Sequence, residues 1–213
     1  RRCLVGSEMC IRDRPKILTF FNSMHDILIT ADNLSYKINE NRLFSSVSFS
    51  LKKGECLHIK GSNGSGKSTL LRIILGITSP TKGEIKAHVK KNIAYLGHKN
   101  ALKSYLSVED NITLMGLSNH KDLKEYLETL SLKKLLDIKV ANLSYGQQKK
   151  LALLRIFLGN TNLIVLDEPF VGLDIENQNI LSNFLNKQLQ KERGIIFTSH
   201  INCNVDSKTI KID

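Results

Sequence analysis

The stretch that decides the fold reads Gly61-Ser62-Asn63-Gly64-Ser65-Gly66-Lys67-Ser68, and Thr69 follows it. It matches the pattern G-x-x-x-x-G-K-[ST] at every fixed position, comes after the apolar stretch 56–59, and opens a predicted helix over 67–75. Glycines let backbone N–H groups converge on phosphate oxygens, and a helix N-terminus adds its positive end. Residues 61–69 therefore predict a nucleotide site, with Lys67 neutralising the β- and γ-phosphates and the Ser68 hydroxyl binding Mg²⁺.

A pair of acids follows the apolar stretch 163–166, which reads as a buried strand. Asp167 stands where an enzyme with such a phosphate loop places the carboxylate that holds Mg²⁺, usually through water. Glu168 is the next residue and is the predicted general base, because it can polarise a water molecule in line with the γ-phosphate. The two carboxylates therefore predict a magnesium site and a base that activates water beside the γ-phosphate.

The remaining apolar patterns predict an α/β fold with a mixed sheet core that a helical insertion interrupts. Strand patterns occupy 27–29, 43–51, 56–59, 163–166 and 195–198, with two short strands expected within 84–95. Helical spacing dominates 108–158 and returns at about 176–190.

The segment Leu143-Ser144-Tyr145-Gly146-Gln147 precedes a predicted helix and ends 20 residues before Asp167. In this order and spacing the chain resembles the ABC (ATP-binding cassette) ATPases, whose signature is L-S-G-G-Q. The resemblance implies the ABC cassette of the P-loop NTPases, with an antiparallel β subdomain beside the sheet core. It also implies that Ser144, Gly146 and Gln147 bind the γ-phosphate held by a second copy, so that a homodimer closes around two ATP molecules.

Two further segments resemble the family in their order along the chain. Gly172-Leu173-Asp174 is similar to the D-loop, which assigns Asp174 to the interface between the two nucleotide sites. His200 follows the predicted strand 195–198 and resembles the switch histidine, which contacts the γ-phosphate and orients the attacking water together with Glu168. Lys67, Glu168 and His200 are therefore the expected catalytic set.

Two other side chains are candidates for the nucleotide and the metal. Tyr36 lies 25 residues before Gly61 and is the aromatic residue expected to stack on adenine, with a plain strand residue as the alternative. His98 stands where the family usually has a glutamine. Its imidazole, if neutral, can bind water or Mg²⁺, so the predicted metal set is Ser68, Asp167 and His98.

Residues 1–23 are expected to be a non-native leader, because 5–14 resembles a translated sequencing adapter. A single domain is then expected over 24–213, with a helical subdomain at about 98–158. The net charge of +11 suits a protein near anionic lipid or one that handles polyphosphates, although a genome that enriches Lys explains it equally well. Cys56 and Cys203 show neither disulfide nor zinc spacing, which indicates a reducing, cytoplasmic compartment. Any membrane role is expected to come through a separate protein, since no stretch approaches the roughly 20 apolar residues of a membrane helix.

Within the ABC ATPases, several segments resemble the ATP-binding subunits of cytochrome c maturation systems. They are 41–44, 95–98 with Lys103, 106–112, 143–155, 167–170 and 198–200. The resemblance implies a peripheral subunit at the cytoplasmic face of the bacterial inner membrane, working with CcmB-like and CcmC-like integral membrane subunits to power haem delivery. Direct contact with haem or nucleic acid is not expected. The alternatives are the ATPase of another small ABC exporter or importer, a P-loop nucleotide kinase, and an ABC protein that acts on nucleic acid.

Overall fold

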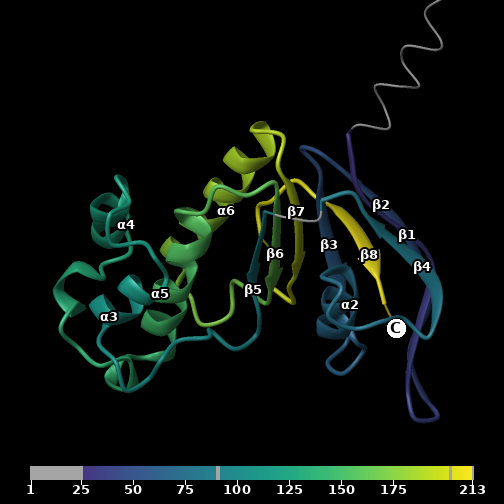
Figure 1. Cartoon of the computed structure of the whole chain (residues 1–213), viewed down its shortest axis with the longest axis horizontal. Helices are drawn as coiled ribbons and strands as arrows, with labels where there is room; N and C mark the ends of the chain where they lie inside the picture. The colour runs from purple at the N-terminus through teal and green to yellow at the C-terminus, as the bar shows by residue number, and fades with distance from the viewer. Residues whose placement is uncertain (1–25, 90–91, 202, 213) are drawn as a thin grey trace, which may run out of the picture.

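The computed structural model describes residues 26–89, 92–201 and 203–212, so the predicted leader at 1–23 lies outside the described residues. The strands form two sheets, a three-stranded antiparallel sheet in the order β2-β1-β4 and a five-stranded parallel sheet in the order β5-β6-β7-β3-β8 (Figure 1). The strands are β1 (Ile27–Ile38), β2 (Asn41–Lys52), β3 (Cys56–Lys60), β4 (Lys82–Ala87), β5 (Ile93–Leu96), β6 (Leu163–Asp167), β7 (Gly194–Thr198) and β8 (Lys208–Lys211). The α/β fold with an antiparallel subdomain is confirmed, and its parallel and antiparallel strands lie in separate sheets.

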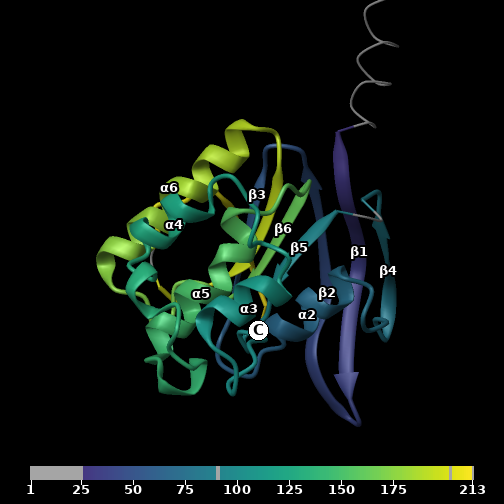
Figure 2. The same cartoon turned by 60° about the vertical axis from the view of Figure 1, so that its left-hand side comes forward.

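The helices divide between the two faces of the parallel sheet. They are α2 (Lys67–Ile74), α3 (Val108–Leu114), α4 (Leu123–Thr129), α5 (Tyr145–Phe157) and α6 (Ile175–Gln190). Figure 1 shows α5 and α6 on one face of the sheet, and β1, β2 and β4 beyond the other. In the turned view of Figure 2 the two groups remain on opposite sides.

The strand β6 lies between β5 and β7, and each of its five residues is buried. Successive side chains of a strand point to opposite faces, and here Ile164 and Leu166 join the core under α5 and α6. Leu163 and Val165 join the second core, which β1, β2 and α2 complete. A parallel strand that is covered on both faces needs a continuous apolar run. Because β3 and β6 run parallel in one sheet, their carboxyl ends lie at the same edge of that sheet.

The predicted helical insertion contains α3, α4, α5 and two short 3₁₀ turns, Lys133–Leu135 and Val140–Asn142. Figure 1 shows α3 and α4 at the end of the molecule farthest from the antiparallel sheet. The helix α3 begins with a capping box, in which Ser107 Oγ accepts a hydrogen bond from the backbone N–H of Asp110 and the Asp110 carboxylate accepts one from that of Ser107. Among the described residues, no helix is long and apolar enough to cross a membrane.

Candidate nucleotide-binding and hydrolysis site

The loop between β3 and α2 has the backbone form that phosphate binding needs. Gly66 precedes the helix with φ +96°, a left-handed conformation that glycine adopts without strain, and no side chain in the described ranges caps the helix. The N–H groups of the first turn are therefore free to donate. Ser65 Oγ is also buried without a hydrogen-bond partner among the described residues. These unpaired donors fit an anionic phosphate group.

The ammonium group of Lys67 lies at the centre of this loop. Its Nζ donates hydrogen bonds to the backbone oxygens of Gly61 and Ser62, both at 2.9 Å. The same Nζ lies 2.8 Å from Nε2 of His200, which follows β7. The fold thus brings two predicted catalytic residues, 133 positions apart in the sequence, into direct contact.

The carboxylates at the end of β6 are held by Thr198, a residue to which the sequence patterns assigned no role. Thr198 Oγ1 donates to Asp167 Oδ1 at 2.8 Å and accepts from the backbone N–H of Glu168 at 2.8 Å. Glu168 has φ +48°, an uncommon value for a side chain other than glycine. Backbone strain of this kind clusters at functional sites, and the bonds of Thr198 help to hold it.

The side chain of Glu168 points toward His200. Its Oε1 lies 3.3 Å from His200 Nε2, and its Oε2 lies 3.4 Å from the backbone N–H of the same residue. Glu168 is buried, and Oε1 has no hydrogen-bond partner among the described residues. An unsatisfied carboxylate oxygen in a buried site is available to accept a hydrogen bond from water. Lys67, Glu168 and His200 therefore form one connected group.

Most of the predicted phosphate and metal residues share one cavity of about 410 Å³. It is lined by Ile38, Leu43, Asn63, Gly64, Gly66, Lys67, Ser68, Thr69, His98, Asp167 and Glu168. Gly61, Ser62 and Ser65 belong to the same loop, and His200 contacts Lys67 and Glu168. The cavity therefore joins the loop, the strand-end acids and His98, which come from three separate parts of the chain.

The donor set in this cavity fits a magnesium ion. Ser68 and Asp167 supply a hydroxyl and a carboxylate, the oxygen ligands that Mg²⁺ prefers. No cluster of three or more His, Cys, Asp or Glu side chains suited to a metal occurs in the described part of the chain. Mg²⁺ usually takes few protein ligands and fills the rest of its coordination with water and substrate phosphates. His98 offers a nitrogen, a poorer ligand for this ion, so its part in metal binding stays a prediction.

A fully buried lysine lies behind the carboxylates. Lys149 of α5 has no exposed surface, and its Nζ has no hydrogen-bond partner within the described ranges. Burial lowers the pKa of this ammonium group, while the charges of Asp167 and Glu168 raise it. The helix that begins at the signature therefore places an ionisable amino group within electrostatic range of the two acids.

The cavity does not include Tyr36. Its ring packs against Phe44, with centroids 6.3 Å apart, and the apolar side chains at the cavity are Ile38 and Leu43. Stacking of adenine on Tyr36 therefore stays a prediction. The sequence patterns did not single out Ile38 or Leu43, because an aliphatic side chain on a strand carries no signal for nucleotide contact.

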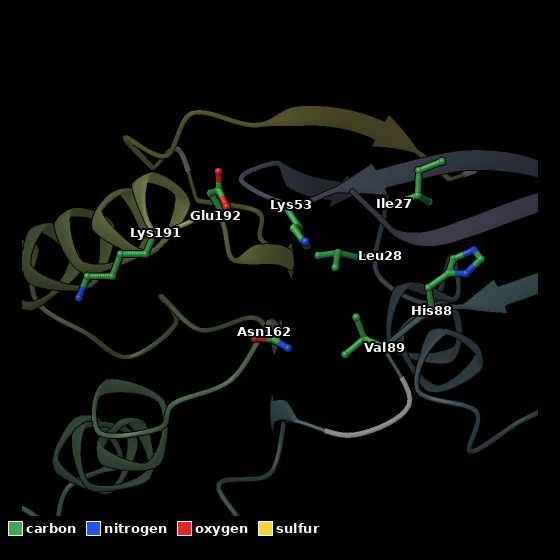
Figure 3. A pocket seen from close by; sticks show the side chains of 8 residues that line it. All are labelled: Ile27, Leu28, Lys53, His88, Val89, Asn162, Lys191 and Glu192. Carbon is green, nitrogen blue, oxygen red and sulfur yellow. The ribbon is translucent and has the colours of Figure 1, made fainter. Parts of the chain in front are cut away.

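A larger cavity, of about 540 Å³, lies at the opposite, amino end of the parallel strands (Figure 3). Its lining includes Leu28, Val89, Asn162 and Lys191, and it contains none of the predicted site residues. Figure 3 shows Lys191 pointing away from the other labelled side chains, so the polar groups do not converge there. Ligands of parallel sheets bind at the carboxyl ends of the strands, and that rule favours the smaller cavity.

The signature residues begin α5 and lie outside the 410 Å³ cavity. Ser144 is the N-cap: its Oγ accepts a hydrogen bond from the backbone N–H of Gln147 at 3.2 Å, and Gln147 Oε1 accepts one from the backbone N–H of Ser144 at 2.9 Å. Asp174 caps α6 in the same way, by accepting a hydrogen bond from the N–H of Asn177. The signature residues therefore stand apart from the cavity that the chain's own phosphate loop lines.

Tyr145, which replaces the first glycine of the signature, packs on Gly172 of the D-loop segment. Gly172 has φ +82°, and a methyl group built there would lie 2.4 Å from Cδ1 of the Tyr145 ring. Tyr145 remains 47% exposed. The bulky ring is thus accommodated because the neighbouring segment has no side chain at this point.

This contact predicts a coupling between the two positions. We expect Gly172→Ala to lower the free energy of unfolding by about 1–2 kcal/mol because of its left-handed backbone. Displacement of the ring adds a further coupling of about 0.5–1 kcal/mol. Urea denaturation of Gly172→Ala in the wild-type and Tyr145→Gly backgrounds measures both terms. An equal loss in the two backgrounds would contradict the contact.

A parallel sheet with a glycine-rich loop at its carboxyl edge, facing a strand-end carboxylate pair, defines the class of P-loop nucleoside triphosphatases. Comparison with known proteins narrows the class. The family model described as "ABC transporter" matches residues 44–171. This chain belongs to the ABC transporter family, and it is an ATPase subunit of that type.

Individual relatives extend the match over most of the chain. A "Cytochrome c biogenesis ATP-binding export protein CcmA" of Dechloromonas aromatica (strain RCB) is 33% identical over 199 residues, which cover 86% of this chain and 98% of that protein. The protein of the same description from Escherichia coli (strain K12) is 32% identical over 197 residues, covering 86% and 94%. A solved structure described as an ATP binding subunit of an ABC transporter is 25% identical with a TM-score of 0.72, covering 87% of this chain and 85% of that one.

Proposed function

We propose that this chain hydrolyses ATP through Lys67, Glu168 and His200 to drive membrane subunits that deliver haem for cytochrome c biogenesis. The observation that carries the catalytic part is the direct contact of Lys67 and Glu168 with His200 at the carboxyl edge of the parallel sheet. The haem-delivery part is supported by the two relatives described as cytochrome c biogenesis proteins.

The proposed reaction transfers the γ-phosphoryl group of ATP to water. Glu168 accepts a proton as the water oxygen bonds to phosphorus, and the bond to the β-phosphate oxygen breaks to give ADP and phosphate. Lys67 and the loop N–H groups neutralise charge on the phosphates, and His200 orients the water with Glu168. Ser68 and Asp167 would hold Mg²⁺, which would supply further charge neutralisation when bound.

The second proposed feature is a homodimer. The signature residues Ser144, Gly146 and Gln147 do not line the cavity that holds Lys67. Ser144 stands at the N-terminus of α5, where backbone N–H groups favour an anion. Two copies arranged head to tail would place each signature over the other copy's triphosphate, with Asp174 of the D-loop at the interface between the sites.

The proposed location is peripheral, at the cytoplasmic face of the bacterial inner membrane, with CcmB-like and CcmC-like integral subunits as partners. The experiment is purification of tagged chain from detergent-solubilised membranes, followed by identification of co-purifying integral proteins by mass spectrometry. We expect those two kinds of subunit, and we expect Glu168→Gln in the same cells to abolish covalently attached haem in c-type cytochromes. Recovery of a lipid, drug or metal permease instead, with normal c-type cytochromes, would contradict the haem assignment and leave the ATPase assignment intact.

A further inference from the structure

His58 is a buried titratable residue with no part in the reaction described above. It lies on β3, three positions before Gly61, and is 5% exposed. Its ring stacks on Phe197 of β7, with centroids 4.3 Å apart and 21° between the planes. Its Nε2 lies 3.0 Å from the backbone oxygen of Ser199. Because a carbonyl oxygen only accepts hydrogen bonds, Nε2 carries the proton and donates it.

The acceptor belongs to the peptide unit that leads into His200. In a planar trans peptide, the C=O of Ser199 and the N–H of His200 point in opposite directions. That N–H lies 3.4 Å from Oε2 of Glu168. One rigid peptide plane therefore receives the His58 hydrogen bond on one side and points its donor at the predicted general base on the other.

We propose that His58 is a positioning residue for ATP hydrolysis, which fixes the Ser199–His200 peptide and thereby holds His200 and Glu168 in their mutual orientation. This inference rests on the proposed role of Glu168. His58 itself lines no part of the 410 Å³ cavity and acts through the backbone. Hydrogen bonds in a chain polarise one another, so the bond to Ser199 also strengthens the donor that faces Glu168.

The surroundings of His58 suit a fixed donor. Burial lowers the pKa of the imidazole, and Lys60 adds to that effect, while the Ser199 bond and the charge of Glu168 raise it. The lowered pKa keeps the ring neutral at neutral pH, with its single proton on Nε2. Phe197 is held in turn by an edge-on contact with Phe170, at a centroid distance of 6.0 Å. The donor thus sits on a packed aromatic layer under the site.

Two substitutions separate the hydrogen bond from the packing. His58→Phe keeps an aromatic ring against Phe197 and removes the hydrogen-bond donor. His58→Gln keeps an N–H donor and loses the aromatic ring that stacks on Phe197. We expect His58→Phe to lower kcat about tenfold while the KM for ATP stays within about twofold. We expect His58→Gln to remain within about threefold of the wild-type kcat. An unchanged kcat in His58→Phe, equal losses in both variants, or a matching rise in KM would overturn the proposal.

A second measurement needs no variant. The ¹⁵N chemical shifts of histidine-labelled wild-type protein report which ring nitrogen carries the proton. We expect the Nε2–H tautomer for His58, and the Nδ1–H tautomer would overturn the proposal even if His58→Phe failed to fold. If the wild type turns over ATP, Glu168→Gln abolishes that turnover and His58→Phe keeps full activity, the role of His58 is contradicted and the proposed function stands. Absence of ATP turnover in the wild-type complex would instead sink the proposed function.

Discussion

Replacing Glu168 by Gln is expected to lower the turnover of ATP at least about 100-fold, because a general base contributes 10²- to 10⁴-fold to such reactions. The amide is nearly isosteric with the carboxylate but cannot accept a proton from water. Its contacts with Thr198 through the backbone and with the His200 N–H are expected to survive. The affinity for ATP should therefore remain within about threefold, since an unchanged phosphate loop supplies the binding.

The same substitution is expected to trap the dimer, because ATP that is bound but not hydrolysed keeps two copies together. Size-exclusion chromatography with light scattering, with and without ATP and Mg²⁺, measures this directly. Glu125→Gln is the matched control, since Glu125 is an exposed carboxylate of α4 outside the cavity. Wild-type turnover in Glu168→Gln would show that Glu168 is not the base.

The second large effect is expected from Lys67→Ala, in the binding of the nucleotide itself. Lys67 contributes a charge-assisted hydrogen bond to phosphate, a kind worth about 1.5–3 kcal/mol, which corresponds to about 10- to 100-fold in the Kd for ATP. The ammonium group also donates hydrogen bonds to the backbone oxygens of Gly61 and Ser62 and contacts the imidazole of His200. We therefore expect a loss of turnover beyond the loss of affinity, because His200 loses a contact that places it.

Isothermal titration calorimetry with ATP and Mg²⁺ measures the change in affinity, and a coupled phosphate assay measures turnover. Lys124→Ala removes an exposed lysine of α4 and is expected to change neither quantity. Wild-type affinity in Lys67→Ala would show that the loop at 61–68 has been misassigned as the phosphate site.

Elements with a strong local signal could be predicted from the sequence. The run 163–166 corresponds to β6 (Leu163–Asp167), and the helix expected at about 176–190 corresponds to α6 (Ile175–Gln190). In both, apolar periodicity and end signals agree with the tertiary environment. The helix after the phosphate loop was expected over 67–75 and ends at Ile74, a difference within the ordinary fraying of helix ends.

Elements that depend on distant partners could not be predicted. The strand β8 (Lys208–Lys211) is mostly exposed and forms only because β3 offers it an edge. The two short strands expected within 84–95 both exist, but β4 pairs with β1 and β5 with β6, in different sheets. Their pairing depends on tertiary contacts that no local pattern contains. β1 and β2 also extend beyond the patterns at 27–29 and 43–51, through bulges at which Asn33 and Ser46 adopt positive φ.

The site divides in the same way. Local sequence motifs predict the roles of Lys67, Asp167 and Glu168, and all three residues line the 410 Å³ cavity. Thr198 and His58 make contacts between neighbouring strands. Thr198 of β7 binds Asp167 at the end of β6, and His58 of β3 binds Ser199, which follows β7. An isolated Thr or His on a strand has many structural uses, so only the strand order β6-β7-β3 shows what these two do.

The most direct test of the central claim is a calorimetric titration of the wild-type chain with ATP, in Mg²⁺ and again in excess EDTA. We expect saturable binding of one ATP per chain, clearly tighter with Mg²⁺, and about 10- to 100-fold weaker in Lys67→Ala. Absence of saturable binding, or binding that neither Mg²⁺ nor Lys67 affects, would contradict a triphosphate site built from the loop at 61–69 and the carboxyl end of β6.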